Sequence, residues 1–225
     1  MQRRRASRGI SAIEFAFSML VLVPLFLGTG AIGINMIKTL QTIQLARDSG
    51  HMYARGVDFS QPGNKTILGN LGQDLGLSTT AGSGKAVVIL SALTYVDKAA
   101  CSSVGAVDGS GNPTSACTNY TKWVFTQRLE IGNTSVRTSN FGSPLVSGPT
   151  GVTVDPTTGK ISTSDYVKKA GAVANFTGIN PYSVVNGVVQ GLPSGQALYV
   201  AEASAKGFKM PPFVSGASTY SYGLF

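Results

Sequence analysis

Histidine, cysteine and tryptophan are scarce in this chain of 225 residues, which contains one histidine, two cysteines and one tryptophan. A metal site needs several cysteine or histidine ligands, and a catalytic thiol needs a neighbouring base, so neither kind of site is predicted. His51, the single histidine, is expected to be structural. Because no nucleophile with a base and no pair of carboxylates stands at a recognisable spacing, the sequence favours a protein that is not an enzyme and needs no cofactor.

Charged residues are also few, at 12% of the chain, and they are unevenly placed. Four of the 18 lysines and arginines lie within residues 1–9, which leaves 14 basic against 10 acidic residues in the remainder. The remainder has no run that combines clustered basic residues with aromatic ones, so nucleic acid is not an expected partner. The 28 glycines and the many serines and threonines are typical of a surface-exposed bacterial protein.

One long apolar run dominates the chain. Residues 10–37 contain a single charged residue, Glu14. At about 1.5 Å per residue this run makes a helix of roughly 42 Å, which is long enough to cross a hydrocarbon layer of about 30 Å. The arginines precede the run and only Lys38 follows it closely, so the positive-inside rule places the N-terminus in the cytoplasm and the rest of the chain across the membrane.

Two residues of this run need an explanation. An ionised Glu14 inside a membrane costs on the order of 2.5–3.5 kcal/mol, so its side chain either reaches back to the interface or has a partner. Pro24 removes one backbone hydrogen bond and is predicted to kink or locally unwind the helix. Three glycines follow within ten residues, and such small residues let helices approach one another closely.

The residues around Glu14 resemble the cleavage site of type IV prepilins, in which a short basic leader ends in glycine and the mature chain has glutamate at its fifth position. Here Gly9 is followed by ISAIEF, and Glu14 is fifth when Ile10 is counted as first. Phe15 completes the Glu-Phe pair of the Flp and TadE-like branch. Residues 40–56 carry a second resemblance to TadE-like proteins, on these residues: Gln44, Ala46, Arg47, Asp48, Tyr53 and Ala54.

The resemblance to the TadE-like family implies a structural protein of the bacterial inner membrane. It implies that a prepilin peptidase cuts between Gly9 and Ile10 on the cytoplasmic face, often with N-methylation of the new terminus. Glu14 would then meet the new ammonium of a neighbouring subunit, and a proline at the depth of Pro24 is common in pilin-like helices. In a medium of low dielectric, the pair of the Glu14 carboxylate and the neighbouring ammonium would set the register of adjacent helices. The expected partners are other pilin-like subunits of a pilus or a Tad-type secretion or adhesion apparatus.

The remaining chain predicts an α+β protein in which the long N-terminal helix is followed by a small antiparallel β-sheet head. An amphipathic pattern continues the helix to about Gly56, and residues 57–225 are long enough for one extracytoplasmic domain. Residues 59–84 resemble a linker, and residues 85–96, 122–131 and 196–206 read as strands, the last of them paired with both earlier ones and followed by an irregular tail.

Alternation in the second of these strands places four apolar residues on one face of the sheet, Trp123, Phe125, Leu129 and Ile131. Cys101 and Cys117 lie between the first two strands, and across the membrane an oxidising compartment would join them. A disulfide that closes a loop of about 15 residues stabilises a fold by roughly 3 kcal/mol in the chain-entropy model.

Two other interpretations remain open on the sequence. The chain could be a bitopic membrane protein whose leader is never cut and whose outer domain binds a surface ligand. It could also be a secreted domain or enzyme whose signal peptide is cut among the small residues 28–31. The first interpretation predicts a chain that starts at Met1, and the second predicts one that starts near Ala31.

Overall fold

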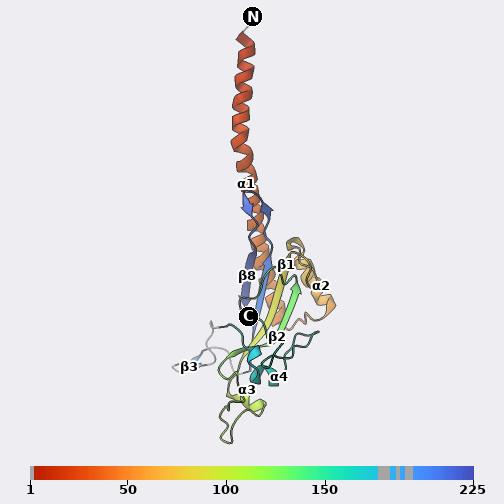
Figure 1. The fold of residues 1–225 in the computed structure, drawn as a ribbon, viewed down its shortest axis with the longest axis vertical. Coiled ribbons are helices and arrows are strands. Elements are labelled where there is room, and N and C mark those ends of the chain that lie inside the picture. The colour runs from red at the N-terminus through yellow and green to blue at the C-terminus, as the bar shows by residue number, and fades with distance from the viewer. Residues whose placement is uncertain (1–2, 177–182, 186–187, 191–194) are drawn as a thin grey trace.

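A computed structural model of the chain describes residues 3–176, 183–185, 188–190 and 195–225. Its longest element is the helix α1, Arg3–Ala54, of 52 residues, which extends from the rest of the molecule as a stalk (Figure 1). α1 runs through Pro24 without a break, so this proline does not unwind it. The helix ends just before Gly56, which takes the left-handed conformation (φ 85°) as glycine readily does, and the predicted end is confirmed.

A four-stranded antiparallel sheet forms the centre of the head, here defined as residues 57–225 together with the part of α1 that packs on them. Its order is β2-β1-β5-β8, and the α+β fold predicted from the sequence is confirmed. Its strands are β1 (Ala86–Tyr95), β2 (Trp123–Gly132), β5 (Ala197–Ala205) and β8 (Thr219–Leu224). β1 lies between β2 and β5, so the prediction that the last predicted strand pairs with both earlier strands was wrong.

A β-bulge in β2 changes which side chains share a face. Ala92 pairs with Gln127 and Leu93 pairs with Phe125, so Thr126 is an extra residue without an opposite partner. Because side chains alternate along a strand, one extra residue moves those beyond it to the other face. The predicted single apolar face of β2 was therefore wrong.

The two faces of the sheet are covered by different cores. The helix-side core lies between α1 and the sheet and includes Leu45, Tyr53, Val88, Leu129, Ile131 and Ala203. The distal core includes Leu93, Trp123, Phe125, Val167 and Val200. Leu129 and Ile131 thus pack with the helix, while Trp123 and Phe125 pack with the distal elements of the head.

The region predicted to be linker-like, residues 59–84, is folded. It forms the helix α2 (Pro62–Leu71) and the 3-10 helix η1 (Gln73–Leu75). α2 begins at Pro62. Proline lacks a backbone N–H, but the first N–H of a helix makes no intrahelical hydrogen bond, so none is lost here. Phe59, Leu68 and Leu75 are buried in the helix-side core, and this burial outweighs a local composition rich in glycine and asparagine.

The remaining elements are short. They are α3 (Lys98–Ser103), α4 (Thr163–Lys168), η2 (Ala170–Ala172), β3 (Ser183–Val185), β4 (Val188–Gln190), β6 (Lys209–Met210) and β7 (Val214–Ser215). β6 and β7 pair as a hairpin, and β8 joins the sheet, so the tail predicted to be irregular is ordered into strands. Figure 1 places α3 and α4 at the end of the head that is farthest from the stalk.

Candidate functional site

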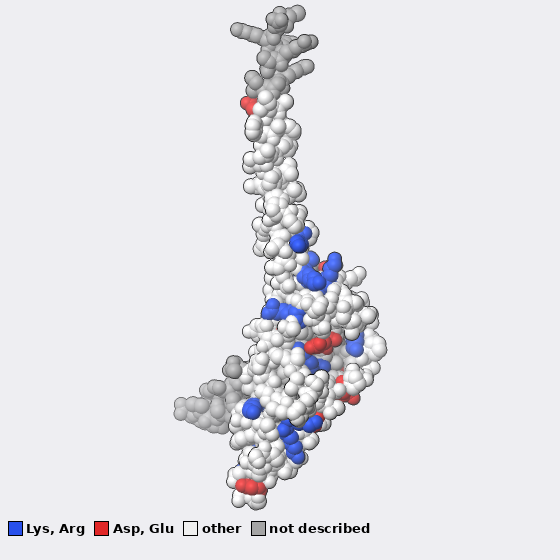
Figure 2. Space-filling model, viewed as in Figure 1, with Lys and Arg blue, Asp and Glu red and all other residues white. Residues whose placement is uncertain are grey.

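The N-terminal half of α1 is a free apolar surface. Every side chain from residue 11 to residue 27 is exposed, including Phe15 and Phe26. Figure 2 shows that charged side chains are nearly absent along this part of the stalk. Among the described residues, α1 holds the one segment that is long and apolar enough to cross a membrane. Burying so much apolar surface is strongly favourable, so this half of the helix needs a lipid or protein environment.

The residues predicted for processing and assembly all lie on this helix. The backbone of Gly9 and Ile10 is helical, and α1 is continuous across the bond between them. Glu14 and Phe15 follow about one turn later, and both side chains are exposed. Pro24 lies about 15 Å further along the axis at 1.5 Å per residue. All of these residues therefore share one helix, but the pairing predicted for Glu14 requires a second chain.

The C-terminal half of α1 is fastened to the head by small and polar residues. Ser49 and Ala46 are buried, and Gly50 leaves room for the ring of Phe225, because a Cβ at Gly50 would lie 2.0 Å from a Phe225 ring carbon. His51 contacts the same ring, with centroids 4.7 Å apart. His51 thus has a packing contact of the kind expected for a structural histidine.

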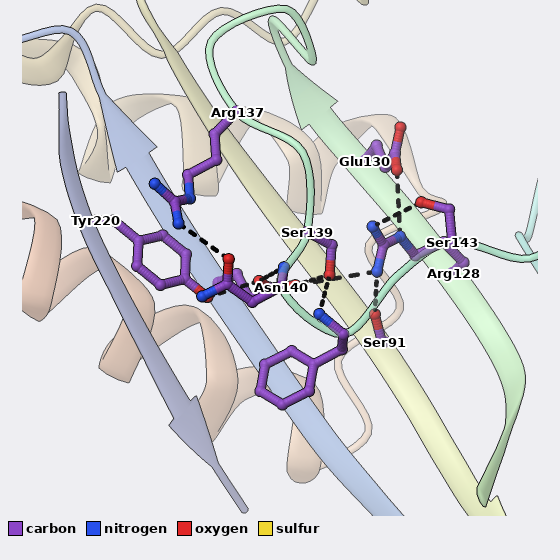
Figure 3. Close-up of polar contacts among 10 residues, drawn as sticks. Ser91, Arg128, Glu130, Arg137, Ser139, Asn140, Ser143 and Tyr220 are labelled. Atoms are coloured by element: carbon purple, nitrogen blue, oxygen red, sulfur yellow. Dashed lines mark hydrogen bonds and ion pairs between the residues drawn. The ribbon is translucent and has the colours of Figure 1, made fainter. Parts of the chain in front are cut away.

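A polar cluster with a buried centre lies on the face of the sheet that points away from α1. It is made of Ser91, Arg128, Glu130, Arg137, Ser139, Asn140, Ser143, Glu202 and Tyr220 (Figure 3). Neighbouring strands supply its charged members. Residues 128 and 130 lie on β2 and residue 202 lies on β5, and alternation places all three on the same face. The loop between β2 and α4 supplies several of the others.

Glu202 is the centre of the polar cluster and is 1% exposed. Its carboxylate accepts hydrogen bonds from the Ser139 hydroxyl, from the Asn140 backbone N–H (2.9 Å) and from the Tyr220 hydroxyl (2.7 Å). The Arg128 guanidinium lies 4.0 Å away. Buried carboxylates persist when they are hydrogen-bonded and paired in this way. Glu202 therefore holds the loop that carries Ser139 and Asn140 against the sheet.

Arg128 is the second buried charge of the cluster. It donates to the Ser91 hydroxyl (2.8 Å) and to Glu130 (3.2 Å). Burial lowers the pKa of Arg128, while the negative charges of Glu130 and Glu202 oppose this shift. Burial and the hydrogen bond to Glu202 raise the pKa of Tyr220, so its hydroxyl stays protonated and remains a donor. Glu202, Arg128 and Tyr220 are hydrogen-bonded to other members of the cluster, and this arrangement suits a structural lock.

Sequence reasoning missed this cluster. Arg128 and Glu130 lie in the second predicted strand, residues 122–131, and Glu202 lies in the last one, residues 196–206, but neither pattern indicates that the three side chains meet. The signal was present in β5, whose sequence ALYVAEASA contains one carboxylate among apolar and small residues. A charged residue in such a strand needs a buried partner. What the sequence does not reveal is that the partners lie on β2, β8 and a distant loop.

The predicted disulfide between Cys101 and Cys117 is confirmed. Cys101 lies in α3, and both residues are buried in the distal core. Asp97 caps α3 by accepting a hydrogen bond from the N–H of Ala100 (2.8 Å). The disulfide closes the loop that begins in α3, at the far end of the head.

We expect the double substitution C101A/C117A to lower the free energy of unfolding of the head by about 3 kcal/mol, because it frees a loop of about 15 residues in the unfolded chain. Urea denaturation in detergent, followed by the fluorescence of the buried Trp123, would measure this loss. The unsubstituted chain treated with a thiol reductant is the matched control and should unfold at the same urea concentration as the variant. An unchanged midpoint after complete reduction would contradict the prediction.

The described residues contain no group of three or more histidine, cysteine, aspartate or glutamate side chains that could hold a metal ion. Comparison with known proteins yields no matching family model, no matching curated protein and no matching solved structure. Three features of this chain bear on its function: the free half of α1, the motif at the start of α1, and the head packed on its other half.

Proposed function

We propose that the chain is a TadE-like pseudopilin or minor pilin, a structural subunit anchored and assembled through α1. The observation that carries the proposal is the division of α1 into two halves. One half is largely apolar and exposed from residue 11 to residue 27, and the other is packed against the sheet. A single helix of this kind holds a folded head at one end and offers the other to a membrane or to like helices.

The start of α1 supports the same proposal. The ISAIEF motif that resembles a prepilin cleavage site lies at the free end of the helix, far from the head. In this proposal a prepilin peptidase cuts between Gly9 and Ile10 in the cytoplasm, and the head lies outside the bacterial inner membrane. The protein acts without a cofactor, is not an enzyme and does not bind nucleic acid.

The spacing between Ile10 and Glu14 predicts the axial offset between neighbouring helices in the proposed assembly. Glu14 lies four positions after Ile10, which is about 6 Å along a helix axis. A carboxylate that pairs with the terminal ammonium of the next subunit would therefore offset neighbouring helices by about one turn. In a membrane or in a filament core of low dielectric, an unpaired carboxylate is strongly disfavoured, so the pair would select this offset over others.

The test is the intact mass and the N-terminal sequence of the chain recovered from the cell envelope and from sheared surface material. We expect a start at Ile10, with or without one added methyl group. A Gly9→Val variant is the matched control, since a branched side chain next to the cut bond should block processing and leave a start at Met1. A start at Met1 in the unsubstituted chain would instead favour an uncleaved bitopic anchor, and a start near Ala31 would favour a secreted domain.

A further inference from the structure

The hairpin formed by β6 and β7 extends from the sheet along α1 toward the stalk. Its base is fastened to the helix at two levels. The Thr42 and Thr219 hydroxyls are hydrogen-bonded at 2.7 Å, and the Lys38 ammonium donates to the carbonyl oxygen of Lys206 at 3.3 Å. Figure 1 shows the two short strands beside α1 on the stalk side of the sheet.

The next contact lies one turn closer to the free end of α1. The Asn35 side chain accepts a hydrogen bond from the Phe208 N–H (2.8 Å) and donates to the carbonyl oxygens of Phe208 (3.2 Å) and Ala31 (3.2 Å). Between Asn35 and Glu14, α1 has no side chain more polar than the hydroxyls of Ser18 and Thr29. The hairpin therefore provides hydrogen-bond partners for the Asn35 amide. Without them, burying this polar group beside a membrane would cost free energy.

The tip of the hairpin reaches the level of Gly28. A Cβ at Gly28 would lie 3.7 Å from Cδ1 of Phe213, so the ring lies beside the helix at this level. A hydrocarbon layer of about 30 Å spans about 20 helical residues. Counted from residue 10, where the apolar run begins, the layer ends near residue 30. The ring of Phe213 therefore lies at the outer edge of that layer.

The chemistry of the tip suits this position. Phe213 is 41% exposed, and the prolines at 211 and 212 have no backbone N–H. The N–H of Phe213 is bonded to the carbonyl oxygen of Met210 at 2.9 Å. Lys209 is exposed at the start of the hairpin, between the levels of Asn35 and Gly28, where lipid phosphates would lie. An apolar tip followed by a cation matches the order of acyl chain and phosphate in one leaflet.

We propose that the β6–β7 hairpin is a second membrane contact, which inserts Phe213 among the acyl chains of the outer leaflet and brings Lys209 to the lipid phosphates. This inference rests on the proposed insertion of α1. The groove between the hairpin and α1, of about 630 Å³, opens at the same level and is lined in part by Ile32, Met36 and Val214, side chains that suit a lipid tail. The hairpin would fix the height of the head above the bilayer and its rotation about the stalk.

The test places a tryptophan at the tip of the hairpin in the full-length chain. Three variants are reconstituted into vesicles of phosphatidylcholine with a minor fraction of phosphatidylglycerol. Phe213→Trp reports on the hairpin, Phe17→Trp reports on insertion of α1, and Tyr222→Trp, at an exposed position of the sheet, is the control outside the membrane. The signal of the native Trp123 is subtracted with the unsubstituted chain. Emission is then compared between ordinary phosphatidylcholine and phosphatidylcholine brominated on its acyl chains.

We expect brominated lipid to reduce the emission of the Phe17→Trp and Phe213→Trp variants, with no loss for Tyr222→Trp. Loss for Phe17→Trp without loss for Phe213→Trp would overturn the hairpin contact while leaving insertion of α1 intact. If the Phe213→Trp emission were shifted to the blue but not quenched, the tip would be covered by protein, and the lipid assignment would be wrong. No loss for any variant would overturn both the hairpin contact and the proposed insertion.

Discussion

The Glu202→Ala substitution is expected to lower the free energy of unfolding of the head by about 3–5 kcal/mol, because it leaves the Arg128 charge in the core without its buried partner. Glu202 is 1% exposed and accepts hydrogen bonds from Ser139, Asn140 and Tyr220, all of which lose their acceptor. This cost is a large share of the total stability of a typical domain. Urea denaturation in detergent, followed by Trp123 fluorescence, would measure it.

Glu130→Ala is the matched control for this experiment. Glu130 also contacts Arg128, at 3.2 Å, but its side chain is 37% exposed where that of Glu202 is 1% exposed. Ion pairs with an exposed partner contribute about 0–1 kcal/mol. We therefore expect Glu130→Ala to be several-fold less destabilising than Glu202→Ala. Equal losses for the two variants would show that the buried carboxylate is not the centre of the cluster.

The Glu14→Ala substitution is expected to impair assembly strongly while leaving membrane insertion intact. Removing the carboxylate makes the helix more apolar, which favours insertion, but it leaves the proposed terminal ammonium of the neighbouring subunit unpaired. Loss of one partner of a buried pair costs about 3–5 kcal/mol, which corresponds to at least a roughly hundredfold weaker contact between subunits. The amounts of the protein in membrane fractions and in sheared surface material measure the two effects separately.

Ser18→Ala provides the control on the same helix. Ser18 lies about one turn beyond Glu14 and is exposed, so its replacement removes a polar group without removing a charge. We expect this variant to insert and assemble as the unsubstituted chain does. If Glu14→Ala cells carried normal amounts of filaments containing the protein, the pairing role proposed for Glu14 would be wrong.

The parts of the fold that the sequence predicts are those that follow from the local spacing of apolar residues. The apolar run and the amphipathic pattern after it predict α1 to within about two residues of its end at Ala54. Runs of β-branched and apolar residues predict β1, β2 and β5 closely. The pairing of Cys101 with Cys117 follows from the absence of any other cysteine and from the expected compartment.

The parts that the sequence does not predict depend on contacts between distant segments. α2 forms in a glycine-rich stretch because Leu68 finds a buried place in the helix-side core. The bulge at Thr126 is stabilised by a bond from its hydroxyl to the carbonyl oxygen of Ala92 (3.1 Å), a partner on another strand. Glu202 likewise depends on residues 18 to 74 positions away, and no local pattern identifies them.

The direction of the strands has a mechanical consequence for a head that is joined to one long helix. Figure 1 shows β1 and β5 running lengthwise beside the packed half of α1. Hydrogen bonds between antiparallel strands are perpendicular to the strands. Tension applied along the stalk would therefore act across many of these bonds at once, in shear, and would not open them one after another. In the proposed assembly, this geometry would let the sheet resist a pull on the head better than a sheet whose bonds open singly.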